Sequence, residues 1–339
     1  MAEPKLLDRM RALLRTRHYS IRTEDTYVQW ARRYILFHDK KHPSMMGAPE
    51  INEFLSWLAV ERNVAASTQN QALSGILFLY REVLGEEVPW MNDLVRARRT
   101  ARVPVVLTRD EVRRLLGAMT GTPHLVARLI YGTGMRVLEA LRLRVKDLDF
   151  QSSEVTVRAG KGNKDRATPL PRVLAGALRH HLERVRALHD RDLAEGFGRV
   201  WMPDALARKY PHADRSWGWQ WVFPSAQRSV DPRSGIELRH HLGEHLVQRA
   251  VQGAARSTGI ARPATPHTLR HSFATHLLQS GHDIRTVQEL MGHASVKTTM
   301  IYTHVLGLGA SGVMSPLDGL GEEMEQPVDV LDAEDNWTT

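Results

Sequence analysis

One segment divides the chain in two and constrains its fold more than any other feature. Apolar residues recur with helical spacing from residue 1 to about 84, lose that spacing between 85 and 106, and regain it afterwards. The intervening segment has prolines at 89 and 104 with four arginines between them. Because proline ends helices, the sequence predicts a linker over 87–106 between two domains. It could run along a polyanion or be a merely exposed connector.

The first segment, residues 1–86, predicts a small all-helical domain. In RTEDTYVQWARRYILFH, the aromatic residues Tyr27, Trp30 and Tyr34 fall three and four apart, so they share one helix face. Thr23 is the expected N-cap of this helix. APEINEFLSWLAVER and STQNQALSGILFLYREVL repeat the apolar pattern, and the segment as a whole predicts four amphipathic helices.

The second segment, residues 107–317, predicts a helical domain with one β interruption. Thr108 and Glu111 form a capping-box pattern at its first helix. In SEVTVRAGKGNKDRATPLP the apolar period becomes two on either side of GKGNKD, which predicts a β-hairpin with a glycine-rich basic turn. The expected fold class is therefore mainly α with a small β-hairpin (α+β). Further helices are expected near 122–132, 136–143, 171–192, 241–258, 265–279, 283–291 and 295–306.

Charge is distributed unevenly along the chain. The last basic residue is Lys297, and 318–339 carries eight acidic residues, so this tail is expected to be disordered. The rest of the chain has 46 Lys and Arg against 30 of the 38 Asp and Glu, a formal charge of +16. A basic body of this kind is typical of proteins that bind nucleic-acid backbones, although an arginine-rich solvated surface would have the same composition.

Composition excludes several classes of function. The chain contains no cysteine, which excludes disulfides, thiolate metal sites and a cysteine nucleophile. No stretch approaches the roughly 18 apolar residues of a membrane span, and the charged N-terminus has no signal-peptide core. No GxxxxGK(S/T) phosphate-binding loop is present. We expect a cytoplasmic protein with no membrane partner and no cofactor.

Polar side chains occupy several positions where an apolar helix face would be expected. Arg136 follows a double-glycine turn at the start of a helix. Lys161 lies at the tip of the predicted hairpin, where it could reach a ligand. His267 and Arg270 lie three apart on one helix face, after the expected cap Thr265. These three stretches share the same pattern, a basic side chain placed beside a turn or a helix start.

A fourth stretch, LMGHASVKTTMIY, combines a histidine and a tyrosine. Gly292 is expected to end one helix and Ser295 to cap the next, which leaves His293 in the turn and Tyr302 two turns into the second helix. Each residue taken alone has a structural explanation. A helical His or Tyr is usually a packing residue, and an arginine after a glycine turn usually pairs with a carboxylate, for which Glu139 is available.

Together these residue types fit one reaction. Two arginines can bind the non-bridging oxygens of a phosphodiester and neutralise charge in a pentavalent transition state. A tyrosine hydroxyl can attack phosphorus and form a phosphotyrosine intermediate. Because the ordinary pKa of tyrosine is about 10, a base or a positive field must help it ionise. Histidine suits that role, and lysine suits protonation of the leaving 5′-oxygen.

The four stretches resemble the conserved motifs of the tyrosine recombinases, the phage-integrase family, in their order and rough spacing. The matching motifs are TGMRVLEALRL, GKGNKDRATPLP, HTLRHSFATHLL and LMGHASVKTTMIYTH. The resemblance extends to LLRTRHYSIRTEDTYVQWARRYILFH and, with the long insertion at 193–235, points to the integron integrase branch. It implies a SAM-like N-terminal DNA-binding domain followed by a mixed catalytic domain.

The resemblance also implies a catalytic set without substitution: Arg136, Lys161, His267, Arg270, His293 and the nucleophile Tyr302. Lys164 in the same turn is a rival, but Lys161 matches the family's lysine in GKGN. The implied activity is site-specific cleavage and rejoining of DNA through a 3′-phosphotyrosyl intermediate, without metal or ATP. The implied substrates are duplex and folded single-stranded sites at which gene cassettes are inserted and excised, bound by a homotetramer on two DNA sites.

The insertion is rich in tryptophan. Trp217, Trp219 and Trp221 alternate, which predicts a strand with all three rings on one face, against a helix expected in MPDALARKY. We expect two of these rings to pack and one to stack on an unpaired base. By analogy with integron integrases, the candidate base contacts are Trp219, Pro232, Arg239, His240 and His241.

Other functions are compatible with parts of this pattern. A type IB-like topoisomerase would use the same chemistry on a single duplex, whereas a catalytically silent DNA-binding or architectural protein would have no use for the tyrosine. His267 and His271 are four apart, but no glutamate follows the first as in a metalloprotease helix, so no metal is expected. The segment VLGLGASGVMSPL after Tyr302 is either passed to a neighbouring protomer, as in family members, or a frayed end.

Overall fold

The computed structural model describes residues 5–88, 97, 104–158 and 165–305. Contacts within the chain divide it into two compact units, Met1–Arg102 and Val103–Thr339. Most of the predicted linker and the whole acidic tail lie outside the described residues. Each unit is described by itself below.

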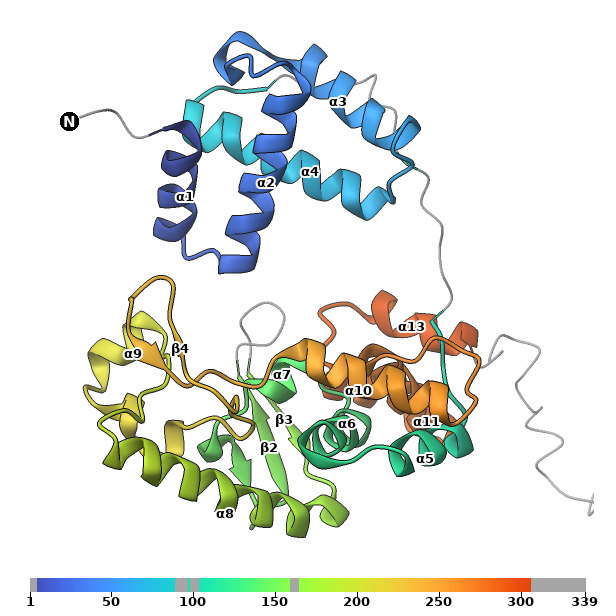
Figure 1. Cartoon of the computed structure of the whole chain (residues 1–339). Coiled ribbons are helices and arrows are strands. Elements are labelled where there is room, and N and C mark those ends of the chain that lie inside the picture. Colours follow the sequence, from blue (N-terminus) through green and yellow to red (C-terminus); the bar gives the residue numbers. More distant parts are fainter. Residues whose placement is uncertain (1–4, 89–96, 98–103, 159–164, 306–339) are drawn as a thin grey trace, which may run out of the picture. The chain divides into compact units, whose positions relative to one another are not determined.

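The N-terminal unit contains the four predicted helices (Figure 1). Its elements are α1 (Leu6–Thr16), α2 (Ile21–Phe37), the 3-10 turn η1 (Pro43–Met45), α3 (Ala48–Val60), α4 (Ala66–Phe78) and the π turn η2 (Leu79–Leu84). Helices α2 and α4 approach closely at Gly75, where a Cβ atom would lie 3.3 Å from the Cα of Tyr27 and the Cβ of Trp30. The aromatic face predicted from the spacing of Tyr27, Trp30 and Tyr34 therefore packs inward, and Trp30 and Tyr34 are buried.

The start of α2 differs from the prediction. The side chain of Ser20 accepts a hydrogen bond from the Thr23 N–H at 3.1 Å, so Ser20 is the N-cap and Thr23 lies inside the first turn. The prediction of Thr23 as cap was wrong. Both residues carry a capping hydroxyl, and the backbone already turns helical at Ile21.

The C-terminal unit, Val103–Thr339, is built around α6, which packs against helices on several sides. Its first helices are α5 (Arg109–Gly117), α6 (Gly121–Thr133) and α7 (Val137–Leu141), and the capping box of Thr108 and Glu111 is present at α5. After the long helix α8 (Arg172–Ala194) and the inserted segment come α10 (Glu244–Ser257), α11 (Pro266–Gln279), α12 (Ile284–Met291) and α13 (Val296–Val305). Helices α10 and α11 pack on α6 and close the main apolar core.

The predicted hairpin forms two strands of a small antiparallel sheet. The 3-10 turn η3 (Val145–Asp147) leads into β1 (Leu148–Asp149), which pairs with β2 (Glu154–Val157), and β2 pairs with β3 (Arg166–Pro169). Val155 lies opposite Thr168, and Val157 lies opposite Arg166. The hairpin tip, residues 159–164, lies outside the described residues.

The insertion forms short elements at one end of this unit, and α11 to α13 lie at the other end (Figure 1). These elements are α9 (Asp204–Lys209), the 3-10 turns η4 (Ala213–Arg215) and η5 (Trp217–Trp219), and β4 (Ser229–Val230), which pairs with β5 (Glu237–Leu238) just after the insertion. Over the described ranges, no helix is both long enough and apolar enough to cross a membrane.

Candidate active site

Helix α11 presents three polar side chains on one face. Thr265 caps the helix by accepting the Thr268 N–H at 3.2 Å, with proline in the first position, as predicted. The spacing of three and four places His267, Arg270 and His271 together, and the rings of the two histidines meet edge to face at 4.5 Å. Arg270 is 1% exposed, although arginine is almost never fully buried without a partner.

The guanidinium of Arg270 joins three distant parts of the chain. It donates to the carbonyl of Gly134 before α7, to the carbonyl of Met291 at 2.6 Å, and to Nε2 of His293 at 3.1 Å. Because arginine has no acceptor, His293 Nε2 accepts here and Nδ1 carries the ring proton. That Nδ1 donates to the hydroxyl of buried Thr299 at 3.0 Å. Arg270 and Thr299 thus fix the tautomer and the orientation of His293.

Tyr302 lies on α13 and is 1% exposed. Its ring packs in an apolar cluster with Phe273, Val287 and Met291, and its hydroxyl lies 2.9 Å from Nδ1 of His271. Burial raises the pKa of Tyr302 to about 12, and the positive charges of arginines nearby act in the opposite direction. The hydroxyl is therefore neutral at pH 7 in this state and needs a proton acceptor to become a nucleophile.

Arg136 lies at the start of α7, near Arg270. Gly134 before it adopts a left-handed conformation with φ of 67°, and a Cβ atom there would lie 2.5 Å from the ring of Phe273. The backbone N–H of Arg136 donates to Glu139 Oε2 at 2.9 Å, and its guanidinium donates to Oε1 at 2.6 Å. Gly134, the second glycine of the turn predicted to direct Arg136, thus lets Phe273 of α11 pack against this turn.

Glu139 is shared by several arginines. Arg166 on β3 donates to Glu139 Oε2 at 2.7 Å, and Arg270 lies 3.9 Å from the same oxygen. Burial alone would raise the pKa of Glu139, but the hydrogen bonds and charges of Arg166 and Arg136 hold it at about 2. We call Arg136, Arg166, Arg270 and Glu139 the Arg270 cluster, in which three guanidinium groups face one carboxylate.

Arg166 also ties the hairpin to the turn that carries His293. Its Nε donates to the carbonyl of Leu290 at 3.0 Å, at the end of α12. Gly292 has φ of 60°, and a Cβ atom there would lie 2.8 Å from the guanidinium of Arg166. Gly292 ends α12 as predicted, because its left-handed backbone favours glycine and a side chain there would displace the guanidinium of Arg166. Lys161 lies outside the described residues, in the tip that this hairpin carries.

The tryptophan segment of the insertion folds differently from the prediction. Trp217–Trp219 form a 3-10 turn, and Trp221 pairs with Arg144 in an isolated bridge, so the expected strand was wrong. A 3-10 turn spaces successive side chains by about 120°, so the rings have separate partners. Trp219 lies under Lys146, with Nζ 2.8 Å from the ring centroid, and Trp221 is buried under Arg144 at 3.2 Å. Alternation alone cannot distinguish a strand from such a turn.

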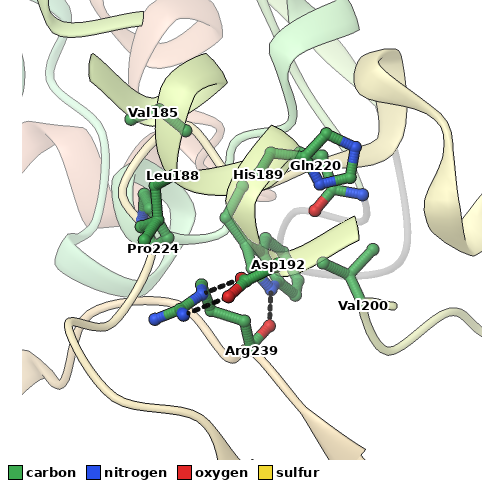
Figure 2. Close-up of a pocket in the computed structure, with 9 residues that line it drawn as sticks. Val185, Leu188, His189, Asp192, Val200, Gln220, Pro224 and Arg239 are labelled. Carbon is green, nitrogen blue, oxygen red and sulfur yellow. Dashed lines mark hydrogen bonds and ion pairs between the residues drawn. The ribbon is translucent and has the colours of Figure 1, made fainter. Parts of the chain in front are cut away.

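Arg239 is buried and bound within the protein (Figure 2). Its Nε and NH2 groups bond the two carboxylate oxygens of Asp192 at 2.5 and 2.7 Å, and NH1 donates to the carbonyls of Ser225 and Ala226. Arg228 bonds Asp192 at 3.0 Å. Arg228 also pairs with Glu195 and Glu237, and we call these five residues the Arg239 cluster.

The other candidate base contacts keep some exposed surface. Trp219, His240 and His241 are half-buried, and Pro232 is exposed. The ring of His241 meets Trp221 edge to face at 5.4 Å, and His240 lies 3.9 Å from Asp231. Over the part of the chain that the structure describes, no three His, Asp or Glu side chains gather as a metal site would require.

Comparison with known proteins identifies the family. A profile of the phage integrase family matches residues 105–307, and a profile of the phage-integrase N-terminal SAM-like domain matches residues 6–90. The first match alone covers more than half of the chain. This chain belongs to the phage integrase family. It is a site-specific tyrosine recombinase, and members of its family are DNA strand-transferring enzymes.

Relatives of known name agree with this assignment. The chain is 55% identical over 316 residues to proteins named integrase/recombinase from Escherichia coli and Pseudomonas aeruginosa, covering 93% of this chain and 94% of theirs. It is 34% identical over 277 residues to the tyrosine recombinase XerD of Agrobacterium fabrum, covering 76% of each chain.

Solved structures share the fold of this recombinase. The lambda integrase dimer bound to a COC′ core site matches with a TM-score of 0.57 at 19% identity, covering 88% of this chain and 93% of that one. The XerH recombinase bound to a palindromic difH substrate, a post-cleavage complex, matches with a TM-score of 0.56 at 22% identity, covering 89% and 81%. These likenesses confirm the predicted two-domain, mainly helical fold.

Within the predicted catalytic set of this recombinase, five of the six residues lie in described segments. Arg136, His267, Arg270, His293 and Tyr302 converge from α7, α11, the α12–α13 turn and α13. The partners of this set were not predicted from the sequence: Arg166, Thr299 and the contact of His271 with Tyr302. The sequence shows only that His271 lies four positions after His267, a spacing that places the two side chains on one helix face but does not predict the contact with Tyr302.

Proposed function

We propose that this recombinase cleaves DNA by attack of Tyr302 on a phosphodiester held by Arg136 and Arg270. The observation that carries the proposal is the convergence of Tyr302, Arg270 and His293 from separate segments into one buried cluster. Such a site supplies a nucleophile beside preorganised cationic groups, with Arg270 and Tyr302 buried and Arg136 and His293 half-buried. Lys161 protonates the leaving 5′-oxygen, and His267 and His293 contact the phosphate.

The charge of the cluster supports this proposal. Three guanidinium groups face the single carboxylate of Glu139, so positive charge is in excess where a phosphate would lie. Burial, with repulsion from Arg136, lowers the pKa of Arg270 to about 10, so this cation is under-compensated in the empty site. A phosphodiester anion would relieve that imbalance and would replace the carbonyl contacts of Arg270 with bidentate bonds.

We further propose that the recombinase is an integron integrase that acts on duplex and folded single-stranded sites to insert and excise gene cassettes. The insertion at 193–235 and the exposed surface of Trp219, Pro232, His240 and His241 support it. These residues contact unpaired bases by stacking and edge contacts. Arg239, which is bound to Asp192, holds the segment in place instead of touching a base.

The assembly is proposed to be a homotetramer on two DNA sites, because exchange of four strands needs four nucleophiles. The segments 1–86 and 107–317 together bind one half-site, with phosphate contacts supplying most of the affinity. The lambda integrase and XerH structures, which share this fold and are bound to DNA, support the proposed DNA binding. No metal or ATP enters the proposed reaction, because the phosphotyrosine retains the energy of the broken bond.

The decisive experiment traps the covalent intermediate. Nicked duplexes with a randomised core, and single strands that fold into hairpins, are incubated with the protein in EDTA, and DNA attached to protein in denaturant is isolated and sequenced. We expect a Tyr302-linked adduct at a defined sequence, absent from Tyr302→Phe. Adducts equal in both proteins would exclude Tyr302 as the nucleophile.

A second step separates the related functions. Two different selected sites are mixed, and recombinant junctions are scored by length. Joining of the two sites supports the recombinase, and relaxation of a supercoiled plasmid without joining would indicate a topoisomerase. Capture of duplex sites alone, with no folded single strand, would contradict the integron proposal. Binding that does not weaken steeply with salt would contradict the proposed phosphate contacts.

A further inference from the structure

His271 lies one helical turn after His267 and is bonded to the hydroxyl of Tyr302. The distance from Nδ1 to the hydroxyl oxygen is 2.9 Å, and the two rings are tilted at 54° with centroids 5.5 Å apart. Among the described residues, His271 is the hydrogen-bond partner of the Tyr302 hydroxyl. This hydrogen bond joins α11 to α13, and it involves the atom that attacks phosphorus in the proposed function.

We propose that His271 is a catalytic residue, the proton acceptor of Tyr302 during DNA cleavage. The inference rests on the proposed role of Tyr302. The O–H bond of Tyr302 breaks as its oxygen bonds to phosphorus, and the proton moves to Nδ1 of His271. The bond from phosphorus to the 5′-oxygen breaks, and that oxygen takes a proton from a separate acid, for which Lys161 is proposed. Rejoining of the strand returns the first proton from His271 to Tyr302.

Two other candidate bases near Tyr302, His293 and Glu139, are already engaged by other partners. His293 accepts from Arg270 through Nε2 and donates to Thr299 through Nδ1, so neither ring nitrogen offers a free lone pair to the tyrosine. The carboxylate of Glu139 is bonded by Arg136 and Arg166. The 2.9 Å contact already has the length of a hydrogen bond suited to proton transfer.

Burial and the charges around the pair keep His271 neutral at pH 7, so Nδ1 can accept a proton, but they also make His271 a weak base while no phosphate is bound. Burial, followed by His267 and Arg270 on its own helix, lowers the pKa of His271 to about 4. Across from it on α13, Tyr302 is under the positive field of Arg270 and of Arg136 on α7, and the ring of His293 in the α12–α13 turn stacks 6.3 Å away. A DNA phosphate bound by the two arginines would offset their charge and strengthen His271 as a base.

The test replaces the base while preserving a hydrogen-bond acceptor. In His271→Asn the amide oxygen can occupy the position of Nδ1 but cannot take a proton at neutral pH. His271→Ala removes both functions. Single-turnover cleavage of the selected nicked duplex is measured for both variants and for wild type, after DNA-binding and circular-dichroism measurements show that the variants fold and bind. We expect both variants to cleave at least about 100-fold more slowly at pH 7.

Two readouts separate proton acceptance from a merely structural role. In the variants the tyrosine proton must leave to solvent base, so cleavage should rise about tenfold per pH unit through pH 9, because the pKa of Tyr302 is about 12, whereas wild type levels off earlier. A 5′-bridging sulfur in the scissile phosphodiester makes a leaving group that needs no proton. Because the sulfur replaces only the need for an acid, the His271 variants should still cleave this substrate more slowly than wild type.

A matched control lies on the same helix. His276 is buried on α11 and its Nδ1 lies 2.8 Å from the hydroxyl of Tyr131, so it repeats the same pair outside the site. His276→Asn should cleave at the wild-type rate in the DNA-bound state. This variant shows whether loss of a buried histidine on α11 slows cleavage for structural reasons alone.

Each opposing outcome overturns the inference. If His271→Asn cleaves like wild type, a hydrogen-bond acceptor suffices and proton transfer is excluded. A pH profile parallel to wild type, or full recovery with the sulfur substrate, would also exclude it. A Tyr302-dependent adduct with normal His271→Asn cleavage overturns this inference alone. An adduct that survives Tyr302→Phe overturns the proposed function instead.

Discussion

Two buried arginines of the same unit, Arg270 and Arg239, are compensated in opposite ways. Arg239 forms a two-point ion pair with Asp192, and the Arg239 cluster contains two arginines with three carboxylates. Arg270 bonds two carbonyls and a neutral histidine, and the Arg270 cluster contains three arginines with one carboxylate. Arg239 is 8% exposed and Arg270 is 1% exposed, so burial does not distinguish the two arginines.

The difference separates a structural charge from a functional one. A buried cation with a bonded carboxylate is already neutralised and has little affinity for a further anion. A buried cation whose hydrogen bonds go to neutral groups, and which shares one carboxylate with two other arginines, retains much of its field, and an incoming phosphate completes its coordination. The predictions below test whether this balance, and not burial, sets the role of each arginine.

The largest effect is expected for Arg270→Lys. Lysine keeps the charge but cannot bond two phosphate oxygens at once, and transition-state donors of this kind are worth about 100- to 1000-fold in rate. We expect such a loss in single-turnover cleavage with little change in DNA affinity. Arg239→Lys is the matched control and should cleave within about threefold of wild type. Equal losses in the two variants would remove the distinction.

The next effect concerns Glu139 and pH. Its pKa is about 2 in the folded protein against an ordinary value of 4.5, so its stabilising contribution is complete above pH 4.5 and is lost as the pH falls toward 2. Glu139→Gln should lower the free energy of unfolding by up to about 3 kcal/mol at pH 7. In urea unfolding, the difference in free energy of unfolding between wild type and Glu139→Gln should shrink as the pH falls from 4.5 toward 2. The buried histidines titrate alike in both proteins, so they do not affect this difference. A difference independent of pH would contradict the assigned pKa.

A smaller effect is expected for Arg239→Met. Removing one partner of a buried ion pair usually costs about 3–5 kcal/mol, but Arg228 still bonds Asp192, so about 2 kcal/mol is expected in urea unfolding. The double variant Arg239→Met with Asp192→Leu should regain part of this loss, because no charge is then left unpaired. Cleavage at saturating DNA should stay near the wild-type rate. A strong loss of cleavage would place Arg239 in the functional class.

The smallest effect is expected for the pair of Lys146 and Trp219. Their contact at 2.8 Å is a cation–π interaction at a half-buried site, worth about 0.5–1 kcal/mol. A double-mutant cycle of Lys146→Met and Trp219→Leu in urea unfolding should give a coupling of that size. A coupling near zero would mean that Lys146 does not fix the position of the Trp219 ring. Trp219 would then be less rigidly placed than Arg239, which is fixed by its ion pair with Asp192.

Local interactions explain which parts of the structure the sequence predicts well. The amphipathic helices, the hairpin, and the starts of α5 and α11 depend on residues within a few positions of one another. Two local predictions failed because the sequence offered two solutions. Ser20 and Thr23 can both cap α2, and alternating tryptophans fit a 3-10 turn as well as a strand.

The sequence by itself determined the residue types and the order of the catalytic motifs, because their chemistry and helical spacing are local properties. Only the tertiary structure decided which arginine is neutralised, since Asp192 and Arg239 are 47 positions apart. It also decided that His271 meets Tyr302, 31 positions away, because that contact depends on how α11 packs against α13. The electrostatic balance of a buried group depends on all neighbours at once, and no local pattern records it.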